Sequence, residues 1–578
     1  MTVHPPKPRF VFSVGVIGHR PDRLPAEMLP RIEQDIADIL TAIRTETLAV
    51  YKRYADCFAR SAPRLVVITA LAEGSDCIAA KLALELGFEL EAPLPFAAQE
   101  YERDFTEAEA KHTFRGFLES ARVVLELEGD RAHAGKSYAA AGLIVLDMAD
   151  MIIGVWDGGE ARGRGGTAEL IGEAARRGMP VVGVGATTTD APRLYWRGLD
   201  DRHTTPIHLD DHPTAPIGSS LAGAIEALVR PPPGGNEKHG LGHYFREKER
   251  RIAPRFEFPL LMLLLGLAWP RKRDFLLPHP EALAKKLIKP GGGSHAIAAA
   301  FGWADSLATR FAQDFRSAVV SNFLLSAIAV FVAVALPYPW SAIELGLILV
   351  LVVNAIIGNW RGWHHRWIES RELAERLRVA SAMYMLASRI SAPFGVAPTW
   401  PAWYARAIRR EAGLRNGRLG ETELSEIRLG LLKLVTDQAA YHERTSQSFT
   451  RLHARLNNVG LFSFVAALVA TAAILLVRGF GLFPYTEGLA RFAIVVSATL
   501  PAIASASYAI RIIGDFEGAA KRSRRMKTQL DALALSLEDR GSELEWLHDR
   551  VHKAGEILLS DLANWRLAAE SRGLAMPG

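Results

Sequence analysis

Three glycine-containing turns in the first 180 residues carry the residue types that bind anions. They read Gly18-His19-Arg20, Glu73-Gly74-Ser75-Asp76 and Gly165-Gly166-Thr167. Glycine lets the backbone approach a phosphate closely, and the amides at a helix N-terminus stabilise negative charge. Arg20 can pair with a phosphate through two N–H groups. These turns predict a site for a phosphate-bearing ligand; the alternative is that they are only tight strand-to-helix connections.

Six apolar, β-rich runs alternate with helical stretches around these turns. They are Phe10–Ile17, Arg64–Thr69, Phe88–Leu94, Arg122–Leu127, Met151–Trp156 and Pro180–Val184. This alternation predicts an α/β unit, an open parallel sheet with helices on both faces. Ligands collect at the carboxyl ends of such strands, and the glycine turns fall there.

The motifs VGVIGHRP, TALAEGSDCIAAKLAL, ADMIIGVWDG and GGTAELIGEA together resemble the SLOG superfamily, whose Rossmann-like fold is shared with the LOG phosphoribohydrolases. The resemblance implies a pocket for a nucleotide or a nucleotide-derived ligand. The matching positions are Gly18, His19, Arg20, Glu73, Gly74, Asp76, Asp157, Gly158, Gly165, Gly166, Thr167 and Glu169.

The loop before Glu169 departs from the LOG enzymes. It runs from Arg162 as RGRGGTAE and lacks the Pro and the Gly-x-Gly spacing of their Pro-Gly-Gly-x-Gly-Thr-x-x-Glu loop. Binding is therefore expected rather than hydrolysis, with no cofactor certain. The alternative is a membrane-tethered nucleotide hydrolase in which Glu169 is the general acid or base.

The sequence argues against a nucleic-acid-binding surface and against a metal site. No long basic run is interleaved with aromatic residues, so nucleic acid is not an expected partner. Cys57 and Cys77 lack metal-ligand spacing, and the adjacent His364 and His365 point in different directions. No metal site is therefore expected.

Four apolar stretches predict transmembrane helices in two hairpins. They are Val319–Leu336, Ser341–Ile357, Val459–Val477 and Phe492–Ile510. The first carries no charge and is long enough to cross the hydrocarbon core of a bilayer, about 30 Å thick. The alternative is buried helices of a soluble protein, which the basic outer flanks of paired apolar runs argue against. The expected fold is a Rossmann-like α/β domain followed by an all-α membrane domain.

Lys and Arg placement predicts the orientation of these spans. The outer flanks of the hairpins are basic, whereas the two turns hold only Arg478 and Arg491. The positive-inside rule places both termini in the cytoplasm. The short apolar segment Phe258–Trp269 suits an interfacial or re-entrant helix; if it spanned, the N-terminal domain would lie outside.

Each hairpin is flanked by charged helices, and this arrangement resembles the SLATT family of two-span membrane effectors. Gln438, Tyr441 and His442 lie where that family carries a Gln-x-x-aromatic-aromatic pattern. The resemblance covers residues 425–540 and, more loosely, 300–395. The expected units are a SLOG-like domain (1–235), a basic linker (236–300), a first hairpin (301–400) and a second hairpin (401–578).

Joining the two resemblances gives a functional hypothesis. They imply a sensor-effector of a bacterial antiphage system, located in the bacterial inner membrane. In it, a nucleotide messenger gates the hairpins of a homo-oligomer to permeabilise that membrane. Residues for helix packing or a pore are Ser497, Ala498, Pro501, Ala502, Ser505 and Ala506, with intrachain packing as the alternative. The rival classes are the hydrolase and a scaffold that binds no ligand.

Overall fold

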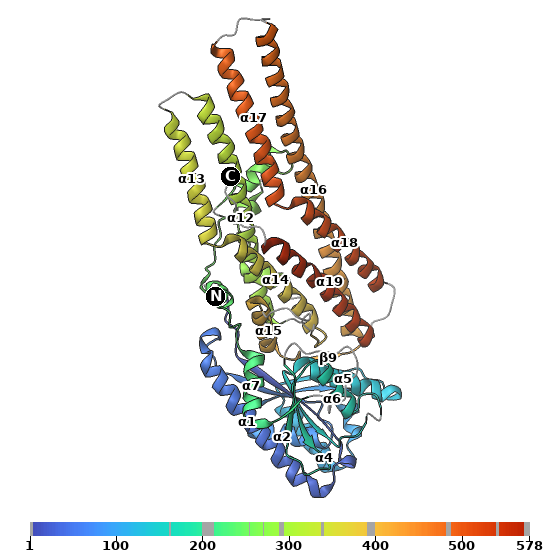
Figure 1. Cartoon of the computed structure of the whole chain (residues 1–578). Helices are drawn as coiled ribbons and strands as arrows, with labels where there is room; N and C mark the ends of the chain where they lie inside the picture. The colour runs from blue at the N-terminus through green and yellow to red at the C-terminus, as the bar shows by residue number, and fades with distance from the viewer. Residues whose placement is uncertain are drawn as a thin grey trace.

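The computed structural model describes residues 4–160, 163–198, 213–253, 255–269, 271–287, 294–336, 340–389, 399–480, 487–538 and 543–570, with only the backbone at 273, 561 and 563–570. An α/β unit forms one end of the molecule and a bundle of long helices extends away from it (Figure 1). The Rossmann-like unit followed by an all-α region is therefore confirmed.

The α/β unit is built on a nine-stranded sheet with the order β8-β7-β6-β5-β1-β2-β3-β4-β9. Along the run β6-β5-β1-β2-β3-β4-β9, neighbouring strands pair in parallel. Strands β7 and β8 form an antiparallel edge beside β6. The strands are β1 (Val11–Gly18), β2 (Arg64–Ile68), β3 (Glu89–Leu94), β4 (Val123–Leu127), β5 (Met151–Trp156), β6 (Val181–Gly185), β7 (Arg193–Tyr195), β8 (Thr214–Pro216) and β9 (Gly417–Leu419).

Helices cover both faces of this sheet because its central strands are apolar on both sides. Along β1, Phe12 and Val14 enter one core, whereas Val11 and Ile17 enter the other. The first core is closed by α1 (Leu29–Arg53), α2 (Ser75–Glu85), α4 (Ala108–Ser120) and α7 (Ile217–Val229), and the second by α5 (Ala134–Met148) and α6 (Thr167–Arg176).

A segment that follows the first hairpin completes the α/β unit. Helix α15 (Trp400–Ala412) buries Trp400 and Trp403, and the Trp403 indole donates a 2.9 Å hydrogen bond to the Val229 carbonyl. Arg410 pairs with the buried Asp150 at 2.8 Å. Strand β9 then pairs with β4, so the sheet includes a strand from beyond residue 235, the predicted end of the first domain.

Within the described ranges, four helices are long and apolar enough to cross a membrane, and this makes the chain a multi-pass membrane protein. They are α12 (His295–Ala335), α13 (Ser341–Trp360), α16 (Glu421–Phe480) and α17 (Glu487–Ile513). Helix α12 packs on α13, and α16 packs on α17, as the two predicted hairpins require. Large apolar side chains at the far end of α16 are exposed, such as Phe462 and Leu475, as expected for a lipid-facing surface.

The other helices connect these bodies. Helices α14 (Trp363–Tyr384), α18 (Phe516–Glu538) and α19 (Leu544–Glu570) lie between the spans and the sheet (Figure 1). The short ones are α3 (Ala98–Tyr101), α8 (Gly235–Arg246), α9 (Glu257–Leu264), α10 (Lys272–Phe275) and α11 (Pro280–Leu287). Helix α9 has eight residues and holds only the first part of the apolar segment Phe258–Trp269, up to Leu264. At 1.5 Å per residue it covers about 12 Å, which is too short to span a bilayer.

Candidate functional site

A cavity of about 360 Å³ opens at the carboxyl ends of the central strands. It brings together seven of the twelve residues predicted to bind a nucleotide, namely Gly18, His19, Arg20, Asp76, Gly165, Gly166 and Thr167. The other five do not line the cavity: Glu73 and Gly74 belong to the second turn, Asp157 and Gly158 follow β5, and Glu169 lies in the first turn of α6. The three glycine-containing turns thus meet at one edge of the sheet.

Side-chain hydrogen bonds hold the turns against one another. The Thr167 hydroxyl donates to the Gly18 carbonyl at 3.0 Å, and the Ser75 hydroxyl donates to the His19 carbonyl at 2.9 Å. Buried His19 also contacts Asp157, with 3.1 Å between Nε2 and Oδ1. Burial raises the pKa of Asp157, but hydrogen bonds from the Gly159 amide and from His19 outweigh it and hold that pKa below its usual range.

Two of the glycines are required by the packing of these turns. A Cβ on Gly18 would lie 2.0 Å from the Ser75 hydroxyl oxygen, so the end of β1 fits against α2 only without a side chain. Gly74 has φ +108°, and its Cβ would lie 2.6 Å from the His19 carbonyl oxygen. Tight turn geometry, the alternative considered for the sequence, therefore accounts for both glycines without a ligand.

The N-terminus of α6 opens into the cavity. Gly166 is the N-cap residue and no side chain caps the helix. Within the described ranges, the Thr167 and Ala168 amides have no hydrogen-bond acceptor. Both residues line the cavity. Amides at this position, with the helix dipole behind them, stabilise a phosphate or carboxylate.

Arg20 already has an anionic partner in the structure. Its Nη2 lies 3.0 Å from the Asp104 carboxylate, and its guanidinium stacks over the Tyr138 ring at 5.1 Å. Burial raises the pKa of Asp104, but hydrogen bonds from Tyr138, Arg131 and Arg20 outweigh it and lower that pKa. A phosphate at this position would have to compete with Asp104 for the guanidinium.

Glu169 has a local structural role. Its carboxylate accepts a hydrogen bond from the Gly165 amide, which lies just before the helix. Glu169 is the third residue of α6 and holds its own turn closed, as acidic residues at this position commonly do. The carboxylate does not line the cavity, so nothing in this geometry points it at a ligand.

Asp76 is a buried carboxyl group that lines the cavity, at 5% exposure. Burial raises its pKa to about 7, although hydrogen bonds from the Thr69 hydroxyl and the Ala72 amide favour the ionised form. Below that pH the neutral carboxyl can donate a hydrogen bond to an anionic ligand, whereas above it the carboxylate repels one.

We expect infrared spectra of the full chain to show this titration. As the pH rises from about 5.5 to about 8.5, one protonated-carboxyl band should disappear, because Asp76 loses its proton there while ordinary carboxyls are already ionised. Asp76→Asn should lack the band. An identical band in this variant, or no change over this pH range, would contradict the assignment.

Arg164 is a cavity residue that the sequence analysis did not single out. It lines the cavity, and its Nη2 pairs with Glu545 at the start of α19, at 2.9 Å. The pair joins the anion-binding turn to the helical region. The two residues are 381 positions apart in the chain, so no local pattern indicates their contact.

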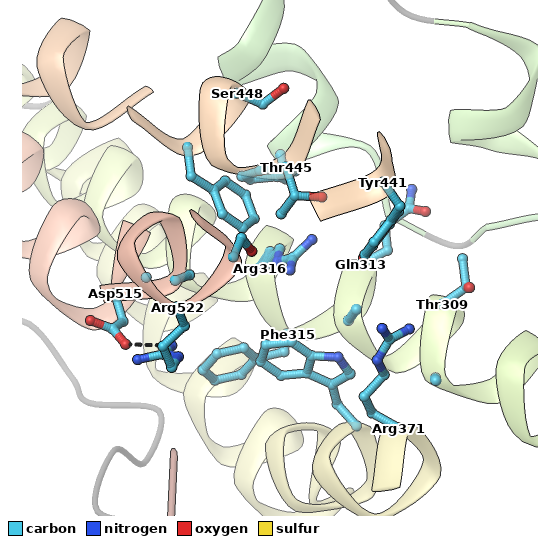
Figure 2. A pocket seen from close by; sticks show the side chains of 18 of the residues that line it. Thr309, Gln313, Phe315, Arg316, Arg371, Tyr441, Thr445, Ser448, Asp515 and Arg522 are labelled. Atoms are coloured by element: carbon cyan, nitrogen blue, oxygen red, sulfur yellow. Dashed lines mark hydrogen bonds and ion pairs between the residues drawn. The ribbon is translucent and has the colours of Figure 1, made fainter. Parts of the chain in front are cut away.

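A second and larger cavity, of about 920 Å³, lies among α9, α12, α14, α16 and α18. Figure 2 shows arginines from three of these helices around it, namely Arg316, Arg371 and Arg522, with Asp515 paired to Arg522. Arg316 lies three residues before the first predicted span, so the cavity is at the basic end of the hairpins. The sequence analysis used these arginines only to orient the spans.

The predicted packing or pore residues divide between two sides of α17. Ala498, Ala502 and Ala506 are half-buried, and Ala506 packs against the protein core. Pro501 is also half-buried, whereas Ser497 and Ser505 are exposed. The alanine stripe thus packs partly within the chain, and the two serines face outwards.

Comparison of the sequence with models of known protein families and with curated proteins finds no match. The resemblance to the SLOG superfamily therefore depends on the four motifs of the α/β unit. The resemblance to the SLATT family depends on the charged helices around each hairpin.

Proposed function

We propose that this chain is a membrane-anchored sensor and effector of a bacterial antiphage system. The SLOG-like domain binds a nucleotide-derived messenger in the cavity at the α6 N-terminus. The SLATT-like hairpins of a homo-oligomer then rearrange and permeabilise the inner membrane. Both termini lie in the cytoplasm in this proposal, as the basic outer flanks of the hairpins favour.

The observation that carries this proposal is the connection between the sheet and the third span. Only Gly420 separates β9, which pairs with β4, from the 60-residue helix α16. At 1.5 Å per residue α16 is about 90 Å long and runs from the sheet through the apolar stretch Val459–Val477. A shift of the sheet edge therefore moves the hairpin without passing through a flexible linker.

Through Arg164, ligand binding can affect the contacts of the same helical region. A phosphate bound at the α6 N-terminus would compete with Glu545 for the Arg164 guanidinium. When the phosphate displaces Glu545 from Arg164, α19 loses a contact with the α/β unit. Such differential contacts are what a ligand needs in order to shift a conformational equilibrium.

Glu545→Gln is expected to tighten nucleotide binding. The variant removes the competing carboxylate, and because the pair is exposed, the gain should be roughly 2- to 5-fold, corresponding to at most about 1 kcal/mol. Glu543→Gln is the matched control, since Glu543 is a nearby exposed residue with the same charge. Calorimetry on the detergent-solubilised chain measures both; unchanged or weaker binding by Glu545→Gln would contradict the competition.

The hydrolase alternative has less support. Its general acid or base, Glu169, is hydrogen-bonded within its own turn and does not line the cavity. A binding site needs only the exposed α6 amides and the nearby guanidiniums, which are in place. Binding without turnover is therefore the activity that we propose.

The test is a panel of mono-, di- and triphosphate and cyclic nucleotides, added to the full chain in detergent. Calorimetry reports binding, and chromatography of the same samples reports turnover. We expect tight binding of one class without turnover. Turnover abolished by Glu169→Gln would support the hydrolase instead, and absence of binding across the panel would support the scaffold.

A further inference from the structure

Two histidines of α19 and one aspartate of α5 converge on a single point. The three residues are Asp147, His548 and His552, and their ligand atoms all lie within 4.8 Å of one another. His548 Nε2 is 3.6 Å from the Asp147 carboxylate. His548 and His552 are four residues apart, so they project from one face of α19. The cluster is separate from the nucleotide cavity, of which none of the three is a lining residue.

We propose that this cluster binds a transition-metal ion of the zinc class. Zinc takes imidazole nitrogens at about 2.0–2.1 Å and carboxylate oxygens at about 2.0–2.2 Å, so tetrahedral ligand atoms lie roughly 3.4 Å apart. The 3.6 Å between His548 and Asp147 fits that spacing. The Ser388 hydroxyl lies among the three ligand atoms, 2.7 Å from His548 Nε2, 2.8 Å from His552 Nε2 and 3.0 Å from Asp147 Oδ2. A bound ion would displace this hydroxyl, and the two imidazoles and one carboxylate would leave its fourth position open.

The surroundings orient the carboxylate and determine which metals fit. Arg177 pairs with Asp147 Oδ1 at 2.7 Å, so Oδ2 is the oxygen that faces the histidines. Outer partners of this kind position metal ligands. Because Arg177 also offsets the negative charge of Asp147, affinity depends mainly on the two imidazoles. Zinc or copper is therefore favoured over magnesium or calcium, which need several oxygen ligands.

A catalytic serine is a weaker interpretation of the same atoms. The Ser388 hydroxyl lies 2.7 Å from His548 Nε2 and 3.0 Å from Asp147 Oδ2. In a Ser-His-Asp relay the carboxylate contacts Nδ1, on the other side of the imidazole from the serine. Here the serine and the carboxylate share the Nε2 side, so the relay geometry is missing.

A bound metal would join parts of the chain that are distant in the sequence. Asp147 belongs to the α/β unit, whereas the histidines belong to α19, which also carries the Arg164 partner Glu545. The ion would hold α19 on the sheet domain. Metal binding does not require the nucleotide proposal, since its ligands lie outside that cavity.

The test is metal retention by the full chain, purified in detergent without a polyhistidine tag. After dialysis against zinc, elemental analysis should find about one ion per chain, and cobalt should give the visible absorption of a four-coordinate site. The double variant His548→Ala and His552→Ala should lose both signals. Thermal midpoints and gel filtration confirm that each variant is folded.

Two controls separate a metal site from a hydrogen-bond network. Ser388→Ala keeps the three ligands and breaks the network, so it should still retain the ion. His239 and His243 form another pair four residues apart, on α8, outside any such cluster in the described part of the chain. Replacing both with Ala should leave retention unchanged. No ion in the wild type, equal retention by the His548/His552 variant, or loss in Ser388→Ala would overturn the proposal.

A different observation, the environment of Arg316, carries a second proposal. Its guanidinium lines the larger cavity and is surrounded by the rings of Phe258, Trp367 and Phe449, at 5.2–5.6 Å. No residue in the described ranges makes a hydrogen bond or an ion pair with it. The nearby carboxylates of Glu375 and Asp515 are paired with other arginines.

We infer that this cavity binds a phosphate group beside Arg316. A guanidinium without a carboxylate partner, enclosed by aromatic rings, gains most from an anion that brings its own charge. The hydroxyl residues Tyr441, Thr445 and Ser448 line the same cavity and can donate further hydrogen bonds (Figure 2). Because the cavity lies at the basic end of the spans, at the depth expected for the membrane surface, the phosphate can belong to a lipid headgroup or be a free ion.

Native mass spectrometry of the full chain tests this site and its two sources. Retention of added phosphatidylglycerol but not phosphatidylcholine would assign the site to a lipid headgroup. Displacement of that lipid by inorganic phosphate, or retention of phosphate alone, would assign it to the free ion. Arg316→Met should abolish retention, whereas Arg361→Met, which removes an exposed charge near the second span, should not. No retention, or equal retention by Arg316→Met, would overturn the proposal.

Discussion

Thr167→Asp is expected to abolish nucleotide binding while leaving the chain folded. Thr167 is the first residue of α6, where an acidic side chain is favourable by about 0.3–1 kcal/mol. The same carboxylate would lie in the cavity, against the phosphate of the ligand. Two like charges about 4 Å apart repel by roughly 4 kcal/mol at an effective dielectric constant near 20, so affinity should fall by about 100-fold or more.

Two matched variants accompany this measurement. Thr167→Ser keeps the hydroxyl that donates to Gly18, so its binding should be close to that of the wild type. Ala108→Asp puts the same charge at the first position of α4, an exposed site outside the cavity. Calorimetry with the best nucleotide of the panel compares the three. Unimpaired binding by Thr167→Asp would remove the α6 N-terminus from the site.

Insertion of a Gly-Ser-Gly-Ser segment between Gly420 and Glu421 is expected to abolish ligand-dependent leakage. The inserted residues break the direct connection from β9 to α16, so a shift of the sheet edge no longer moves the helix. Nucleotide affinity should stay within about 3-fold of the wild type, because the cavity lies at the centre of the sheet and β9 at its edge.

The control carries the same segment between Ser61 and Ala62, an exposed turn before β2. That insertion leaves the path from β9 to α16 intact, so both binding and leakage should persist. Liposome leakage and calorimetry on the two insertions distinguish loss of coupling from loss of folding. Full leakage by the Gly420 insertion would show that the signal takes another route.

The parts of the fold that follow local patterns were predictable from the sequence. All six expected strands are present, because a strand buried on both faces must be apolar along its length. The four spans were equally predictable, since a helix that crosses the hydrocarbon core must be long and apolar. In both cases the whole element lies in one apolar environment, the protein core or the lipid, so its residues are apolar and the pattern is visible in the sequence.

The strand β9 was not predictable because it has no pattern of its own. It consists of three residues, and its partner β4 is almost 300 positions earlier in the chain. It follows α15 in the chain, whose tryptophans are buried in the core beside the sheet. Contacts between such distant segments are a property of the packed molecule, and residue periodicity does not report them.

The candidate sites show the same division. The turns that meet at the cavity carry visible glycine motifs, whereas the Arg20 partner Asp104 comes from an unrelated segment. The spacing of His548 and His552 indicates a shared helix face, but the third ligand, Asp147, is about 400 positions away. The sequence therefore indicates those site residues that share a local motif, whereas their partners from distant segments are known only from the fold.

Dye leakage from liposomes tests the central claim most directly. The full chain is reconstituted, and the nucleotide that binds best in the panel is added on the side of the α/β unit. The sensor-effector account predicts leakage that rises with nucleotide occupancy and is absent from Thr167→Asp. No leakage at saturating nucleotide, or equal leakage by Thr167→Asp with and without it, would contradict the account.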